Sequence, residues 1–331
     1  MTQMKNPSRV LVIQPLPGIG DTLWFLPHLK VLGDFYKEAH MSLLTKLSSK
    51  ADEVLEGQLP LEKILWLHRE TEHAGLGGVF RLASLLKKEK FDAVWVLHKS
   101  PRYALAAWLA GIPRIYGYGL SYGRYFVQPP TLTREERSVH PIQQAEALLR
   151  HHGLGDRLSS YGLTVPLEQQ SAIQKRYALR KDTNGLVLGI GGSEPYKKWP
   201  TASFAQLALR LGAKGYKVFV LGGMKEKEEA LTIQSLVEKE GGTVVPVFDL
   251  SLQASFALLS QMRYFVGNDT SMLNAAALLG VQTIGIFAKT PPLSYRLNLH
   301  PFVSKGTHPS IDQVTVEEIW HYFEGLTGSV L

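Results

Sequence analysis

The sequence predicts an α/β protein built from two doubly wound parallel sheets, with a cleft between the two domains. Short apolar segments alternate with helical segments along the chain, which is the pattern of strands and helices in such sheets. A polar stretch over residues 155–184 interrupts the alternation once. A chain of 331 residues is long enough for two domains that each bury a core. We therefore expect one domain over residues 1–165 and a second over 166–331.

The N-terminal half begins with an apolar strand over residues 9–14, followed by a helix from Thr22 to about Tyr36. Further strands are expected at 41–45, 63–68 and 91–98, and further helices at 79–90, 102–111 and 140–154. The helix over 102–111 ends at Gly111, as expected of a helix with a glycine at its carboxyl end.

The C-terminal half repeats this alternation. Strands are expected at 186–192, 217–223, 243–248, 264–269 and 282–287, and helices are expected to begin at Thr201, Glu226, Leu252 and Thr270. Ligands of doubly wound sheets bind outside the carboxyl ends of the strands. Asp21 and the segments 191–198, 222–226 and 268–274 all lie at such ends, so we treat them as candidate sites.

The amino-acid composition excludes some classes of site and favours some classes of partner. The chain has no cysteine, which excludes disulfides, thiolate nucleophiles and cysteine-ligated metals. Its net charge of +7 favours anionic partners such as nucleotides, phosphorylated glycans or acidic membrane surfaces, or it gives a solvated basic surface. The basic residues are scattered, unlike those of a nucleic-acid groove, so no nucleic acid is expected.

Targeting and metal signals are also missing from the sequence. No apolar run reaches the roughly 18 residues of a membrane span, and the N-terminus lacks the apolar core of a signal peptide, so we expect a cytoplasmic protein. The sequence has no D-x-D pair, and His98, His140, His151 and His152 show no ligand spacing with carboxylates on a shared face. We expect neither a metal nor a cofactor.

The segment PGIGDTL, after the first strand, raises two interpretations of Asp21. It is not a dinucleotide fingerprint, because Leu23 stands where the third glycine belongs and no acid follows the second strand. A nicotinamide cofactor is therefore not expected. Asp21 is either a helix-capping residue or a carboxylate that acts as a general base at the sheet edge.

Two glycine-rich loops in the C-terminal half point to phosphate and ribose. In GIGGSEPYKKWP, backbone N–H groups, the Ser193 hydroxyl and Lys197 or Lys198 form a plausible phosphate cradle, although the spacing is not that of a P-loop. A solvated lysine pair is the alternative. Glu226, after LGGMK, is either an acceptor for ribose hydroxyls or a surface acid.

A third segment, VGNDTSMLNAAALLG, places Asp269 and Thr270 at the start of a helix. The free N–H groups of a helix N-terminus form a ready anion site. Asp269 as a cap of its own helix is the alternative.

Taken in this order, the motifs resemble those of the heptosyltransferases, glycosyltransferase family 9 of bacterial lipopolysaccharide core synthesis. The resemblance runs over nearly the whole chain, from RVLVIQPLPGIGDTLWFLPHLKVL through KKWP and GNDTSMLNAAALLGVQTIGIF to VTVEEIW. It implies the GT-B arrangement of two Rossmann-like domains facing across a cleft. The N-terminal domain would hold a lipid-linked or other anionic glycan acceptor, with possible peripheral contact with the inner membrane, and the C-terminal domain an ADP-heptose-type donor.

The resemblance also implies roles for single residues. Asp21 matches the catalytic carboxylate and Lys197 the lysine on the donor phosphate, and the remaining donor contacts fall on Gly192, Ser193, Glu226, Leu250, Asp269 and Thr270. The family commonly has D-T-G-x-x-H where this chain has Ser271 for glycine and Asn274 for histidine. Both are expected at the donor site.

Acceptor contacts are expected at Gly20, Lys99 and Arg102. The predicted reaction is a metal-independent, inverting glycosyl transfer. Two alternatives stay open: a sugar-nucleotide epimerase of the same architecture, which would convert donor without an acceptor, and a non-catalytic nucleotide-sugar-binding protein, which would bind without turnover.

Overall fold

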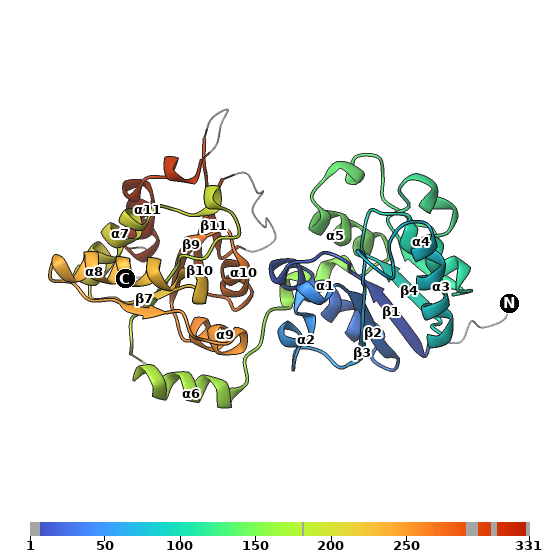
Figure 1. The fold of residues 1–331 in the computed structure, drawn as a ribbon, viewed down its shortest axis with the longest axis horizontal. Helices are drawn as coiled ribbons and strands as arrows, with labels where there is room; N and C mark the ends of the chain where they lie inside the picture. Colours follow the sequence, from blue (N-terminus) through green and yellow to red (C-terminus); the bar gives the residue numbers. More distant parts are fainter. Residues whose placement is uncertain (1–6, 181, 289–296, 306–309, 329–331) are drawn as a thin grey trace. The chain divides into compact units, whose positions relative to one another are not determined.

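The computed structural model describes residues 7–180, 182–288, 297–305 and 310–328. The chain divides into two compact units, an N-terminal unit of residues 1–162 and a C-terminal unit of residues 163–331 (Figure 1). The division falls three residues before the predicted boundary at 165. Each unit is a parallel sheet with helices on both faces, which confirms the predicted doubly wound α/β class.

The N-terminal sheet has five parallel strands in the order β3-β2-β1-β4-β5. They are β1 (Arg9–Ile13), β2 (His40–Thr45), β3 (Leu61–Trp66), β4 (Ala93–Val96) and β5 (Arg114–Gly117). Its helices are α1 (Ile19–Phe35), α2 (Ala51–Val54), α3 (Gly77–Glu89), α4 (Arg102–Leu109) and α5 (Pro141–His151). The strand order reverses direction between β1 and β4, so the crevice of this sheet lies at their carboxyl ends.

The C-terminal sheet has six parallel strands in the order β11-β10-β9-β6-β7-β8. They are β6 (Gly185–Gly189), β7 (Lys217–Leu221), β8 (Val245–Val247), β9 (Tyr264–Asn268), β10 (Gln282–Phe287) and β11 (Leu299–Val303). Here the order reverses between β6 and β9. The carboxyl ends of these two strands therefore form the crevice of this sheet.

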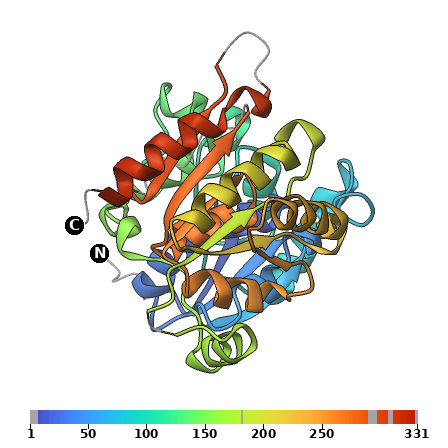
Figure 2. The same cartoon turned by 90° about the vertical axis from the view of Figure 1, so that its left-hand side faces the viewer.

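The helices of the C-terminal unit follow the strands in alternation. They are α6 (Leu167–Tyr177), α7 (Thr201–Ala213), α8 (Lys227–Lys239), α9 (Leu252–Ser260), α10 (Ser271–Leu278) and α11 (Val316–Gly328). Figure 2 shows α7 and α11 together on one face of the sheet, where Phe204 and Phe323 join its core. Among the described residues, no helix combines the length and the apolarity that crossing a bilayer requires.

One local expectation is wrong, and one segment holds a helix that the sequence did not indicate. The first helix begins at Ile19 and not at Thr22, because the Asp21 carboxylate accepts a hydrogen bond from the Gly18 N–H and fixes the helix start further upstream. The polar stretch 155–184 contains α6, which packs on α9 through hydrogen bonds of Gln261 with Gln170 and Gln174. Its few apolar residues hid this helix from the pattern of the sequence.

Candidate functional site

In the N-terminal unit, the helix start beside β1 positions Asp21. The Gly18 N–H donates to Asp21 Oδ2 at 2.8 Å, so one carboxylate oxygen caps the helix. A Cβ on Gly18 would lie 2.9 Å from that oxygen, so a side chain there would displace the Asp21 carboxylate. The predicted contact Gly20 lies inside the first turn of α1 and not in a loop. The capping interpretation of Asp21 is thus satisfied, and the carboxylate is held at the carboxyl end of β1.

Positive charge gathers at the same edge of the N-terminal sheet. Lys46, Arg69 and Lys99 follow β2, β3 and β4. Burial, and then the charges of Lys99, Arg69 and Lys46, lower the pKa of His98 to about 4. His98 Nδ1 accepts a hydrogen bond from the Ser100 N–H at 3.0 Å, so the neutral ring carries its proton on Nε2. The ring is therefore an uncharged group among cations.

Arg102, the other predicted acceptor contact, is engaged by the backbone of the loop before α3. Its guanidinium donates to the carbonyls of His73 at 2.7 Å and Gly75 at 3.4 Å. Arg102 thus holds this loop against the start of α4, whereas Lys99 is exposed. No observation here tests either residue as an acceptor contact.

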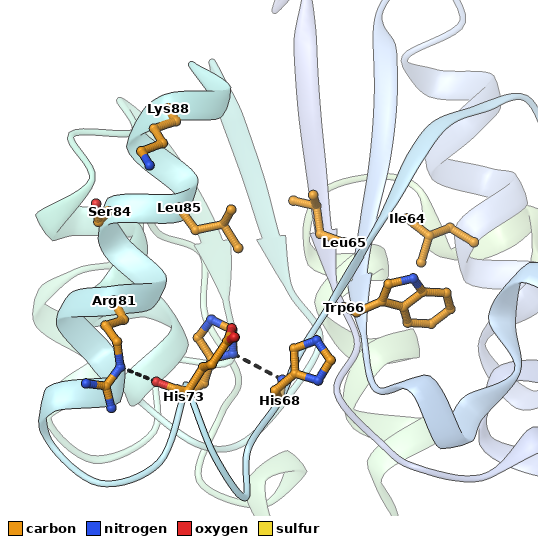
Figure 3. A pocket seen from close by; sticks show the side chains of 10 residues that line it. Ile64, Leu65, Trp66, His68, His73, Arg81, Ser84, Leu85 and Lys88 are labelled. Atoms are coloured by element: carbon orange, nitrogen blue, oxygen red, sulfur yellow. Dashed lines mark hydrogen bonds between the residues drawn. The ribbon is translucent and has the colours of Figure 1, made fainter.

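A cavity of about 500 Å³ lies between β3 and α3 (Figure 3). Its lining is Ile64, Leu65, Trp66, His68, Glu72, His73, Arg81, Ser84, Leu85 and Lys88. His73 Nδ1 accepts from the His68 N–H, and Arg81 donates to the Glu72 carbonyl. Burial lowers the pKa of His73, which favours its neutral form. The cavity contains none of the residues predicted to form the site.

In the C-terminal unit, the crevice between β6 and β9 brings the predicted phosphate cradle together. Gly191, Gly192 and Ser193 follow β6, and Lys197 ends a short 3-10 helix, η5 (Pro195–Lys197). Lys197 Nζ lies 3.4 Å from Asp269 Oδ2, and the Asp269 side chain is only 8% exposed. The cradle and the Asp269 segment are therefore neighbours in space.

Asp269 does not cap α10, because Thr270 occupies the N-cap position and the Asp269 carboxylate faces Lys197. Ser271 is the first residue of α10, and Asn274 is buried in its first turns. The first backbone N–H groups of this helix thus begin beside the lysine loop. Leu250, the predicted nucleobase contact, follows β8 and lies just before Ser251, the N-cap of α9.

Lys198, the second lysine of the loop, is paired with the carboxylates of α8. Its Nζ lies 2.9 Å from Glu229 Oε1 and 3.4 Å from Glu226 Oε1. Partial burial lowers the pKa of Lys198, but the hydrogen bond and charge of Glu229, then Glu226, raise it above its ordinary value. Glu226 also accepts from the Gly223 N–H at 2.9 Å, so it is a held carboxylate and not a solvated surface acid.

Asn268 begins the candidate segment 268–274, but the sequence interpretation gave this residue no role of its own. Its fully buried amide donates to the carbonyls of Ile190 and Gly191, both at 3.0 Å, and accepts from the Trp199 N–H at 3.0 Å. It therefore ties both ends of the lysine loop to β9. A buried asparagine before the Asp-Thr pair was the available signal, because a buried amide needs partners. In the described part of the chain, no three His, Asp or Glu side chains gather as a metal site would require.

Comparison with known proteins decides the family. The model of glycosyltransferase family 9 (heptosyltransferase) matches residues 79–315, well over half of the chain. The chain belongs to this family. A curated relative, lipopolysaccharide heptosyltransferase 2 of Salmonella typhimurium, is 24% identical over 344 residues, covering 94% of this chain and 96% of the relative. The resemblance found in the motifs is therefore confirmed, and the chain is a glycosyltransferase.

Solved structures agree on the fold. A glycosyltransferase family 9 protein from Veillonella parvula superposes with a TM-score of 0.78 at 19% identity, covering 96% of this chain and 97% of that one. An Escherichia coli heptosyltransferase with ADP-2-deoxy-2-fluoro heptose gives 0.70 at 16% identity, covering 96% and 99%. At such identities the likeness concerns the fold, and it supports the GT-B class of two parallel-sheet domains.

Proposed function

We propose that the protein transfers heptose, with inversion, from an ADP-heptose-type donor to a lipopolysaccharide core or related glycan acceptor. The observation that carries the proposal is the family match, joined to a lysine loop, an Asp-Thr helix start and a held glutamate at one sheet crevice. The name of the Salmonella relative and the ADP-sugar analogue of the Escherichia coli structure support the substrate class.

The donor belongs to the C-terminal unit in this proposal. Lys197 and the N-terminus of α10 face the diphosphate, because a helix N-terminus and a lysine both favour negative charge. Gly192 offers its backbone N–H to the phosphate, and a Cβ there would lie 2.6 Å from Lys198 Cγ, so the lysine packs against this glycine. Glu226 accepts hydrogen bonds from ribose, and the backbone near Leu250 meets the base. Ser271 and Asn274 line the same helix start.

The acceptor belongs to the N-terminal unit, and Asp21 is the general base. Asp21 takes the proton of an acceptor hydroxyl as its oxygen forms a bond to the anomeric carbon. The bond from that carbon to the diphosphate oxygen breaks, and ADP leaves with the electron pair. Lys197 and the α10 N-terminus stabilise the charge that grows on the leaving group, which is the larger kind of contribution in such sites.

An anionic acceptor suits the charge of the N-terminal edge. Lys46, Arg69 and Lys99 lie close enough to depress the pKa of His98, so their fields overlap there. Gly20 and Arg102 complete the proposed acceptor contacts, Arg102 through the loop that it holds. A lipid-linked acceptor would also bring the protein into peripheral contact with a membrane.

The test is a transfer assay with purified protein, ADP-heptose and a heptose-deficient lipopolysaccharide core. The proposal predicts ADP release that requires acceptor, with a product heavier by one heptose in mass spectrometry. Conversion of the donor without acceptor would identify an epimerase instead. Tight ADP binding without turnover on any core acceptor would identify a non-catalytic binding protein. Trials with other nucleotide sugars would define the influence of Ser271 and Asn274.

A further inference from the structure

A surface of the N-terminal unit exposes large apolar side chains around α4. We call it the α4 surface, and its members are Leu76, Phe80, Trp108, Tyr122 and Tyr125. Leu76 is 86% exposed, and Tyr125 is 71% exposed. Single exposed apolar residues are ordinary, but a group of them marks an interaction site.

The start of α3 contributes the first part of this surface. The Arg102 guanidinium, in the first turn of α4, donates to the Gly75 carbonyl at 3.4 Å, and Leu76 follows directly. Phe80 lies four residues after Leu76 at the start of α3, on the same side. Because α3 and α4 pack against each other, the start of α3 that carries these two side chains lies beside α4.

The 3-10 helix η2 (Ser121–Tyr125) contributes the second part. A Cβ on Gly123 would lie 3.0 Å from Pro101, so η2 rests on the residue that precedes α4. The rings of Trp108 and Tyr122 both pack against Phe126, with centroid distances of 5.3 and 6.4 Å. The exposed rings of α4 and η2 therefore belong to one contiguous surface.

The charge of this part of the chain has a single sign. Residues 93–134, which hold β4, α4, β5 and η2, contain no Asp or Glu. The same stretch contains the cations Lys99, Arg102, Arg114, Arg124 and Arg134. The Arg124 guanidinium lies 4.8 Å from the centroid of the Tyr125 ring, so a cation accompanies the most exposed aromatic ring of η2. Two acids, Glu70 and Glu72, lie in the loop before α3, which is not part of residues 93–134.

We propose that the α4 surface docks on an anionic phospholipid bilayer. Tryptophan and tyrosine favour the bilayer interface, and each nearby lysine or arginine adds attraction to anionic headgroups. The loop before α3, the start of α4 and η2 follow β3, β4 and β5, so they share the sheet edge that carries Asp21. The proposal gives the proposed function a place for a lipid-linked acceptor, and in that sense it rests on that function.

The experiment is co-sedimentation of the full chain with vesicles of phosphatidylcholine alone or of equimolar phosphatidylcholine and phosphatidylglycerol. We expect binding to the anionic vesicles only, falling as salt screens the charges. Arg124→Gln should weaken binding about fivefold. The double variant Trp108→Ser, Tyr125→Ser should weaken it about tenfold or more. Leu167→Ser, a change at an equally exposed apolar residue on α6, should bind like wild type.

Wild-type protein that stays in the supernatant with anionic vesicles would overturn the proposal, as would a double variant that binds as wild type does. Equal binding to neutral vesicles would overturn its electrostatic part. Melting temperature and ADP affinity must match wild type in every variant. Transfer to a water-soluble core saccharide should persist in the double variant, so a failure of the docking surface is distinct from a failure of heptose transfer.

Discussion

The two sheets share a doubly wound topology, but their carboxyl edges differ in how charge is compensated. At the C-terminal crevice, Lys197 and Lys198 each face a carboxylate. At the N-terminal edge, Lys46, Arg69 and Lys99 form no ion pair among the residues that the structure describes. Paired lysines are held in place before a ligand arrives, whereas unpaired cations leave a net field that attracts anions. In the proposed function, the comparison separates a donor site with positioned lysines from an acceptor edge with unpaired cations.

Replacing Asp21, at the crevice of the N-terminal sheet, gives the largest expected effect. Asp21→Asn should lower kcat by about 10²–10⁴-fold, because a positioned general base contributes that much. An amide oxygen still accepts the hydrogen bond of the Gly18 N–H, so the helix start survives. Initial-rate measurements of ADP release check this.

The matched control for Asp21 is Asp52→Asn, which changes another acid in the first turn of a helix of the same unit. It should leave kcat unchanged. An Asp21→Asn protein that turns over at the wild-type rate would reduce Asp21 to a helix cap.

At the C-terminal crevice, the two neighbouring lysines Lys197 and Lys198 can be compared with each other. Lys197→Met should lower kcat about 10²-fold, in the range seen when one group that stabilises leaving-group charge is removed. Lys198→Met should have a much smaller effect on kcat, because Glu229 and Glu226 hold the Lys198 ammonium at the start of α8, whereas Lys197 lies beside Asp269 and the start of α10. Equal losses in single-turnover rates would mean that the two lysines share the role.

The buried amide of the C-terminal crevice predicts a combined loss of stability and donor affinity. Asn268→Ala removes three hydrogen bonds and leaves buried backbone groups unpaired, which should cost about 3 kcal/mol of unfolding free energy. The freed loop should raise the donor KM about tenfold. Urea unfolding and steady-state kinetics measure the two effects.

Asn298→Ala is the control, since Asn298 also donates to two backbone carbonyls but far along the chain from the loop. It should destabilise the protein and leave the donor KM intact. A raised donor KM in this variant would attribute the Asn268 effect to general loosening.

The smallest predicted effect is a loss of folding stability at low pH, caused by His28. His28, on α1, is fully buried, and burial lowers its pKa to about 3. Neither ring nitrogen makes a hydrogen bond to the described residues, although the carbonyls of Trp24 and Ile142 lie near. As pH falls below about 6.5, His28 therefore takes up a proton in the unfolded chain but not in the folded protein. The contribution of neutral His28 to the free energy of unfolding is lost progressively from that pH towards pH 3.

At pH 5 the loss from His28 amounts to about 2 kcal/mol relative to pH 7. The variant His28→Leu should lack that part of the loss in urea unfolding at the two pH values. Wild type and variant losing equal stability between pH 7 and pH 5 would contradict the account of His28.

Much of the architecture was predictable from the sequence, because alternating apolar and helical segments are a local signal. The phosphate loop and the Asp-Thr pair were also predictable, since both follow strands whose carboxyl ends meet at the crevice. The partners of Lys198 were not, because they depend on how α8 packs beside the loop. The role of Asn268 was not predictable, because it needs the distant carbonyl of Ile190, and spacing along the chain does not encode that contact.

Measuring ADP affinity is the most direct test of the proposal that the C-terminal crevice binds the donor and the N-terminal edge binds the acceptor. Isothermal titration calorimetry should give Asp21→Asn a Kd within about twofold of wild type, because the proposed function assigns Asp21 to the acceptor and not to ADP. Lys197→Met should bind ADP about tenfold or more weakly, because a charged contact to phosphate is lost. Weakened binding in Asp21→Asn with unchanged binding in Lys197→Met would contradict the account.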